Sequence, residues 1–423
     1  MAFQDIRKPR QFLTPADMGF ILIMILLIAA LFALNLYLAR TLKGGEWLFL
    51  RWSAARAFLV DGADPYSSTI AQRVQILAYG REAYLNEYPF ALNDPFYIVL
   101  LYIPLALFSD FPVVHALWML CSQAALVGIV LLALDLSGWE PPGWMTVLLI
   151  GFGLLSSFSV ASFLSASPAI FFTLIFLGIL TSLRARFASD EFAGILLCLI
   201  AYQWEISALF FFVVLVFAIA NRRWGVISGF VMTLIILGIV SFLVNSSWAV
   251  PYIRAALFDW SRKADYTFAT TLSYIFPSAA IPADRWLAAI AGAILLLETI
   301  RSVYSHDRHF AWVAFLALAL NPMLGFAIFP TNHVVLLPAL IMIIALIWER
   351  WTNRRALISV AALFLIVLMF YGLRYQTLNA PERLYSDALR ILPPVLATIG
   401  LYWMRWWAIG APRLWADQFG TRA

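Results

Sequence analysis

Apolar runs long enough to cross a membrane fill most of this chain of 423 residues, and they constrain its fold more than any other feature. A helix needs about 20 apolar residues to cross the hydrocarbon core of a bilayer. The runs predict about twelve spans, all helical, because lipid offers no partner to an unpaired backbone group. The predicted spans are 17–38, 95–108, 113–134, 145–163, 168–183, 192–220, 224–244, 286–304, 310–329, 334–348, 356–373 and 389–409.

The composition supports a membrane protein, since 63% of residues are hydrophobic and 12% are charged, whereas soluble domains have about 25% charged residues. The net charge of +5 is spread over short loops, which argues against a nucleic-acid partner. Both cysteines lie in apolar runs, so we expect no disulfide framework and no metal site. We therefore expect an all-α polytopic integral membrane protein with one domain, residues 1–423, and no cofactor.

Basic residues near both ends of the chain predict that both termini are cytoplasmic. Arginine greatly outnumbers lysine, which hints at a GC-rich bacterial genome and hence a bacterial inner membrane. The span count then places a first outer loop, 40–94, and a second, 245–285, on the outer face. It also places Arg184 outside, against the positive-inside rule. Either nearby acidic residues offset this charge, or the run 192–220 is a hairpin broken near 202–205.

The first outer loop is the largest polar segment, and it carries a helical pattern. Trp47, Leu50, Ala54 and Phe58 fall on one face of a helix, with Arg51 elsewhere. A charge at the bilayer centre costs about 2.5–3.5 kcal/mol on insertion scales. We therefore expect 47–59 and 69–85 to be amphipathic helices lying on the membrane surface.

Glu46 is the sharpest candidate for chemistry in this loop. It follows Gly44 and Gly45, which allow the backbone to turn out of the membrane. Partial desolvation there raises the pKa of a carboxylate and makes it a better base. The simpler interpretation is an interfacial charge at a helix end.

Other candidates lie in segments that the span count puts outside. His333 lies in a short turn, where it could meet a phosphate or a substrate hydroxyl, or simply the lipid headgroups. Arg254, Arg262 and Lys263 form a basic cluster that suits a clamp on a phosphate, or again contact with headgroups. The chain has no Walker A, GxGxxG or HExxH motif, which argues against a nucleotide-bound substrate.

Several motifs lie in and just after the first outer loop: Gly45-Glu46-Trp47, 53–59, Gly62-Ala63-Asp64-Pro65-Tyr66, 87–90 and 102–106. Together they resemble glycosyltransferase family 87 of the GT-C superfamily, which includes mannosyltransferases that use polyprenyl-phosphate mannose. The match to its first luminal loop covers about fifty residues in motif, and hydropathy agrees over most of the chain. A late stretch, 332–340, resembles a leucine-rich segment of the family's last helices.

The resemblance implies a GT-C-like bundle that transfers a sugar from a polyprenyl-phosphate donor to a lipid, glycan or protein acceptor on the outer face. It implies an inverting single displacement with Glu46 as general base, where the family usually has Asp. We expect the substrate to be bound by His333, Arg254, Arg262, Lys263, Asp94, Tyr66 and Arg51. The family's two helix breaks correspond to Ser165-Ala166-Ser167-Pro168 and Tyr202-Gln203-Trp204-Glu205, which differ from its pattern.

Three other functions fit a polytopic chain. A transporter is expected to show internal repeats and charges at mid-membrane, and no repeat is visible. A glycan polymerase or ligase is expected to have its dominant outer loop late in the chain. A non-catalytic scaffold of envelope assembly is the third alternative.

Overall fold

The computed structural model describes residues 15–84, 87–185, 189–263, 266–275, 280–305, 307–379 and 383–410, which are helical almost throughout. Within these ranges the β pairing is one isolated antiparallel bridge, between Thr267 and Ala327. The elements are α1 (Pro15–Thr41), α2 (Glu46–Val60), α3 (Ser68–Tyr79), α4 (Phe96–Leu101), α5 (Ile103–Ala106), α6 (Phe111–Ser137), α7 (Gly143–Leu155), α8 (Ser157–Leu164), α9 (Ala169–Ala185), α10 (Asp190–Ile200), α11 (Trp204–Ala220), α12 (Trp224–Val244), α13 (Ala249–Lys263), α14 (Phe268–Ile275), α15 (Ala280–Val303), α16 (Asp307–Leu320), η2 (Asn321–Leu324), η3 (Pro330–Leu336), α17 (Leu337–Arg350), α18 (Arg355–Asn379), α19 (Arg383–Trp403) and α20 (Arg405–Ile409).

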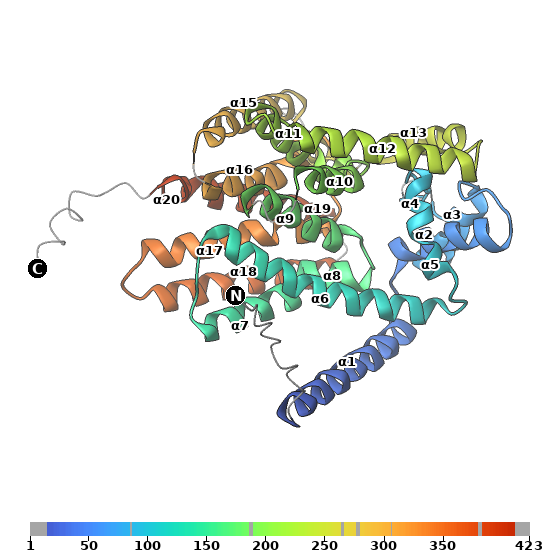
Figure 1. Cartoon of the computed structure of the whole chain (residues 1–423), viewed down its shortest axis with the longest axis horizontal. Coiled ribbons are helices and arrows are strands. Elements are labelled where there is room, and N and C mark those ends of the chain that lie inside the picture. The colour runs from blue at the N-terminus through green and yellow to red at the C-terminus, as the bar shows by residue number, and fades with distance from the viewer. Residues whose placement is uncertain are drawn as a thin grey trace, which may run out of the picture.

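Long apolar helices form the body of the molecule (Figure 1). By length and composition, 6 helical stretches of the described chain can cross a membrane, or 7 if α7 and α8, which meet at 47°, form one bent span. In α1 only 6% of the apolar window is buried, so its large side chains face outward over most of its length. Apolar surface of that extent suits lipid, and the protein is accordingly membrane-embedded. The stretches are 17–41, 111–137, 224–244, 285–303, 330–350 and 355–379.

The count by length and composition is smaller than the twelve spans that the sequence predicts. Residues 95–108 do not form a span, because Pro95 and Pro104 start two short helices, α4 and α5, one after the other. The run 310–329 is also interrupted, since α16 gives way to the 3₁₀ turn η2 at Asn321-Pro322. Breaks of this kind shorten helices that hydropathy alone reads as continuous.

One end of the bundle gathers arginines and their acidic partners, and we call it the basic end. Arg184 at the end of α9 pairs with Asp135 near the end of α6 at 3.3 Å and with Asp307 at the start of α16 at 3.8 Å. Arg308 pairs with Glu349 of α17 at 2.8 Å. These pairs join the ends of helices that are distant in the sequence.

The run 192–220 is a hairpin, not one span. It breaks at 201–203 into α10 and α11. Arg223, just after α11, pairs with Asp190 at the start of α10 at 3.5 Å and donates to the carbonyl of Leu183 at 2.7 Å. The start of α10 and the end of α11 therefore both lie at the basic end, together with Arg184.

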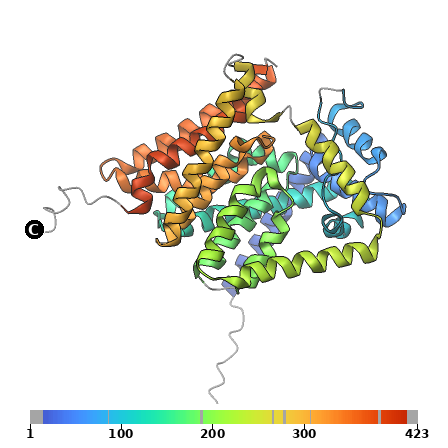
Figure 2. The same cartoon turned by 90° about the horizontal axis from the view of Figure 1, so that it is seen from above.

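The opposite end, which we call the site end, carries a second apolar cluster built from α2–α5 and neighbouring loops, with α13 close by (Figures 1 and 2). The segment 47–59 is helical as expected, but it is not amphipathic. Buried side chains surround α2, Arg51 and Trp52 among them, so neighbouring protein segments cover most of this helix. That it lies on the membrane surface stays a prediction. Its small residues Ala54 and Ala55 let neighbouring segments pack closely on every side. The second predicted helix is shorter than expected and ends at Tyr79.

We predict that Ser189 and Asn221 lie on one side of the membrane and Thr69 on the other. The test is labelling of single cysteines at these positions with a membrane-impermeant thiol reagent in sealed vesicles, in a chain without Cys121 and Cys198. A single span over 192–220 would place Ser189 and Asn221 on opposite sides, so their labelling from different sides contradicts the hairpin.

Candidate functional site

A glycine turn places Glu46 at the first position of α2. Gly45 has φ of +80°, and its N–H donates to the carbonyl of Leu164 at 2.9 Å. A Cβ atom at Gly45 would lie 3.0 Å from ring atoms of His115 and 3.1 Å from the ring of Phe111. Both the left-handed conformation and this contact require glycine. The turn therefore fixes the start of α2 against α6 and the end of α8.

The Glu46 side chain is half-buried and lines a cavity of about 290 Å³. Desolvation by burial raises its pKa to about 7, although a hydrogen bond from its own backbone N–H opposes this shift. Lys43 lines the same cavity, and the remaining wall comes from the end of α3 and from Phe90. Glu46 is thus a carboxylate that gains and loses its proton near neutral pH beside an open space and a cation.

A buried ion pair lies one helical turn further along α2. Arg51 Nε lies 2.7 Å from Asp94 Oδ2, and Arg51 Nη2 donates to Asp94 Oδ1 at 3.1 Å. The two side chains are 4% and 1% exposed. Tyr66 donates its hydroxyl to the Asp94 carbonyl at 3.0 Å, and Gln203 donates to Asp94 Oδ1 at 3.4 Å. Arg51, Asp94 and Tyr66, which we expected to bind substrate, thus come together and bind one another.

Lys263 belongs to a second buried cluster. Its ammonium group bonds to Glu205 and lies 2.6 Å from Asp259 Oδ2. Asp259 also accepts from Tyr88 at 2.5 Å and from Asn93 at 2.6 Å. The two carboxylates raise the pKa of Lys263 against the opposing effect of burial. Lys263 is therefore engaged by carboxylates, contrary to the expected role as a free phosphate clamp.

Three helix breaks meet between these two clusters. Ser167 after α8, Gln203 between α10 and α11, and Asn332 in η3 all line one cavity of about 20 Å³. Ser167 donates to Asn332 at 3.3 Å. A cavity of this size holds about one water molecule. The two breaks that the sequence singled out, 165–168 and 202–205, thus meet η3 in one polar junction, with Arg51 and Lys263 on its walls.

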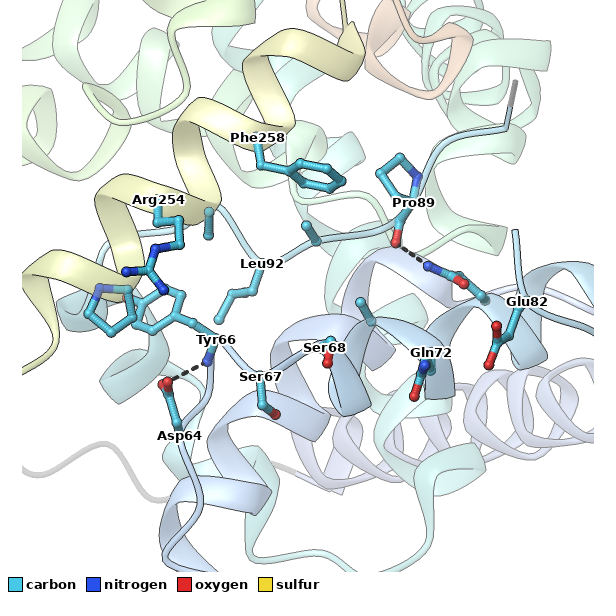
Figure 3. A pocket seen from close by; sticks show the side chains of 15 residues that line it. Asp64, Tyr66, Ser67, Ser68, Gln72, Glu82, Pro89, Leu92, Arg254 and Phe258 are labelled. Carbon is cyan, nitrogen blue, oxygen red and sulfur yellow. Dashed lines mark hydrogen bonds between the residues drawn. The ribbon is translucent and has the colours of Figure 1, made fainter. Parts of the chain in front are cut away.

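A cavity of about 510 Å³ lies between α3, residues 89–92 and α13 (Figure 3). Arg254 lines it from α13. Arg262, on the same helix, lies 5.5 Å from the ring of Phe258. Arg254 and Lys263 therefore serve different parts of the site end, and Arg254, Arg262 and Lys263 do not converge on one pocket as the expected clamp requires.

His333 lies inside the bundle and not at an exposed turn. It is 3% exposed, and its Nε2 is 3.2 Å from the carbonyl oxygen of Leu389. It lines a separate cavity of about 20 Å³ with Glu205 and Asn332. The structure therefore does not join His333 to the Glu46 cavity as we had expected. The turn 330–333 folds inward because η3 continues directly into α17.

Sequence reasoning missed several polar residues of the site end. Lys43 lines the Glu46 cavity, and Asn93 and Asp259 hold one of the buried clusters. The Asn93-Asp94-Pro95 turn before an apolar run was the available signal for Asn93. Nothing in the local sequence connects Asp259 with Tyr88, because their contact depends on the tertiary fold.

Comparisons with known proteins give no relative: no family model, no curated protein and no solved structure matches this chain. Within the described ranges, no group of three His, Cys, Asp or Glu residues is placed to hold a metal ion.

We predict that Gly45→Ala lowers the thermal stability of the purified protein. The left-handed conformation costs an L-residue about 1–2 kcal/mol, and the contact with His115 adds to this. Gly62→Ala is the matched control, since Gly62 has φ of +60° and no atom within 4 Å of its added Cβ. Equal losses of melting temperature in the two variants would show that the approach to His115 does not matter.

We predict that Arg51→Met costs about 3–5 kcal/mol of stability, because it leaves the Asp94 charge buried without its partner. The double variant Arg51→Met with Asp94→Leu should lose less than Arg51→Met alone. Arg40→Met is the control, because the side chains of Arg40 and Asp110 are 58% and 50% exposed and their closest charged atoms lie 3.5 Å apart. An exposed pair of this kind contributes little to stability. Similar unfolding curves for the Arg51 and Arg40 variants would contradict a dominant role of the buried pair.

Proposed function

We propose that this protein is a membrane glycosyltransferase that moves a sugar from a polyprenyl-phosphate donor to an acceptor hydroxyl, with Glu46 as the general base. The observation that carries the proposal is the place of Glu46 at the start of α2, lining a cavity together with Lys43. Burial there raises the pKa of Glu46 to about 7. A general base works best when its pKa lies near the working pH. The resemblance of the surrounding stretch to family 87 supports the same residue.

The reaction assigned to this cavity is an inverting displacement. The acceptor hydroxyl oxygen attacks the anomeric carbon while Glu46 takes the hydroxyl proton. The bond between that carbon and the phosphate oxygen breaks, and the phosphate leaves with the bonding electrons. One carboxylate suffices for this route, whereas a retaining double displacement uses a second carboxyl group.

Lys43 is the cation best placed to stabilise the departing phosphate. It lies at the end of α1 beside the Glu46 cavity, whereas Lys263 is engaged by two carboxylates and Arg254 lines another cavity. A cation beside the leaving oxygen stabilises the charge that develops there. α1 is exposed along most of its length, so a lipid-borne donor can approach Lys43 from the bilayer.

The proposed topology follows from the two ends of the bundle. We assign the basic end to the cytoplasm, because arginines gather there, and the site end to the outer face of a bacterial inner membrane. Relative to the twelve spans predicted from the sequence, the hairpin of α10 and α11 adds one crossing. The run 95–108 forms only the short helices α4 and α5, which removes one crossing. An even number of crossings is therefore retained in this proposal.

We predict that Glu46→Gln lowers sugar transfer by about 10²–10⁴-fold, because glutamine keeps the size of the side chain but takes no proton. Glu46→Asp should keep part of the activity. The assay follows transfer from polyprenyl-phosphate mannose in proteoliposomes, with Glu140→Gln as the control, an exposed glutamate in the loop between α6 and α7. Transfer by Glu46→Gln at the wild-type rate would assign the base to another residue, with Asp64 and Asp94 next to test.

The same assay gives a pH prediction. Glu46 acts as a base only when it is deprotonated, so the rate should rise with pH, reach half its plateau near pH 7 and stay constant above it. A carboxylate in water would reach its plateau more than two pH units lower, since its pKa is about 4.3. A rate that is flat from pH 5.5 to 8 contradicts a desolvated base.

A further inference from the structure

The 510 Å³ cavity between α3 and α13, which we call the α3–α13 cavity, takes no part in the chemistry assigned to Glu46. Its size is within the usual range for small-molecule sites. The α3–α13 cavity and the Glu46 cavity share α3 as a wall. Gln72 and Gln75 line the α3–α13 cavity, and Tyr79 lines the Glu46 cavity. Two substrates bound in the two cavities would therefore be neighbours.

The walls of the α3–α13 cavity are held in place without a ligand. Gln75 donates to the Pro89 carbonyl at 2.7 Å and accepts from the N–H of Ala83 at 2.9 Å. The Tyr66 ring is fixed through its hydroxyl, which bonds to the Asp94 carbonyl, and the Tyr66 N–H donates to Asp64 at 3.0 Å. Figure 3 marks two of these bonds with dashed lines, the one that the Pro89 carbonyl accepts and the one from the Tyr66 N–H to Asp64. A site with preset walls binds at a lower entropy cost than one that must be ordered.

The lining mixes hydrogen-bond acceptors, donors and ring faces. Asp64 and Glu82 offer carboxylate oxygens, and Arg254 offers a guanidinium group that makes no hydrogen bond or ion pair with any described residue. Phe258, 44% exposed, and Tyr66 supply apolar ring surface. In Figure 3 Arg254 and Phe258 project from α13 toward the opposite wall formed by residues 64–72.

This mixture selects among ligand classes. A sugar hydroxyl both donates and accepts, so it can use the carboxylates and the guanidinium together. The apolar face of a sugar ring can lie on Phe258 or Tyr66. A phosphate, or the carboxylate of a uronate, only accepts hydrogen bonds, and Asp64 and Glu82 would repel its negative charge. A lipid chain would leave the polar lining without partners.

We propose that the α3–α13 cavity binds a neutral, hydroxyl-rich saccharide. Its assignment as the glycan part of the acceptor rests on the proposed transferase function, whereas the binding itself does not. The saccharide lies along α3, and the assignment as acceptor requires its reacting hydroxyl to pass residues 89–92, which form a wall of both cavities, to reach Glu46.

The test measures saturation-transfer NMR on the full-length protein in lipid nanodiscs, with mannotriose and maltotriose as neutral probes and trigalacturonate as the anionic probe. The neutral probes should bind more tightly than trigalacturonate. Arg254→Ala and Phe258→Ala should each weaken binding by about tenfold, the loss of one good contact. Trp260→Ala is the matched control, because Trp260 is 65% exposed on the same helix and does not line the cavity.

The Glu46→Gln variant separates this inference from the proposed function. It should bind the neutral probes as the wild type does, while its sugar transfer is lost. Normal transfer with normal binding would overturn Glu46 as base and leave the saccharide site standing. The saccharide site is overturned if the neutral probes do not bind, if Arg254→Ala and Phe258→Ala both bind normally in a folded protein, or if trigalacturonate binds best.

Discussion

The arrangement of the site end depends on the buried ion pair between Arg51 and Asp94. Two charges removed from water are stable only when each is paired and further hydrogen-bonded, and here Gln203 and the Trp47 carbonyl supply such bonds. The pair ties α2 to the segment before α4 and to the turn between α10 and α11. It thereby fixes the height of α2, and with it Glu46, relative to the membrane bundle.

Hydropathy predicted the helical class and the membrane character because both follow from the composition of local runs. It could not predict where helices break inside the bundle. At Gln203 and Asn321, protein groups satisfy the freed backbone: the Asn321 side chain bonds to the Leu209 N–H and the Glu205 carbonyl. It also misjudged α2, because a helix surrounded by protein needs small residues on all sides and shows no apolar stripe.

Prediction from the sequence succeeded for the desolvated setting of Glu46, which one residue and its neighbours decide, whereas the role of Glu46 as a base stays a prediction. The two glycines before Glu46 indicate a tight turn, and burial at such a turn raises a carboxylate pKa. It failed where charge partners come from distant segments. Lys263 appeared to be an available cation because the sequence does not show that Glu205 lies beside it. His333 was expected at an exposed turn because the sequence does not show whether a short turn folds outward or into the bundle.

The central claim is that Glu46 meets the reacting group of a lipid-borne donor, and a density map of the protein in nanodiscs with a non-hydrolysable polyprenyl-phosphonate sugar tests it most directly. The account predicts the phosphonate beside Lys43 and the anomeric carbon facing the Glu46 cavity, with a gap that admits one hydroxyl group. A sugar bound in the α3–α13 cavity or beside His333, with no part of the donor near Glu46, would contradict it.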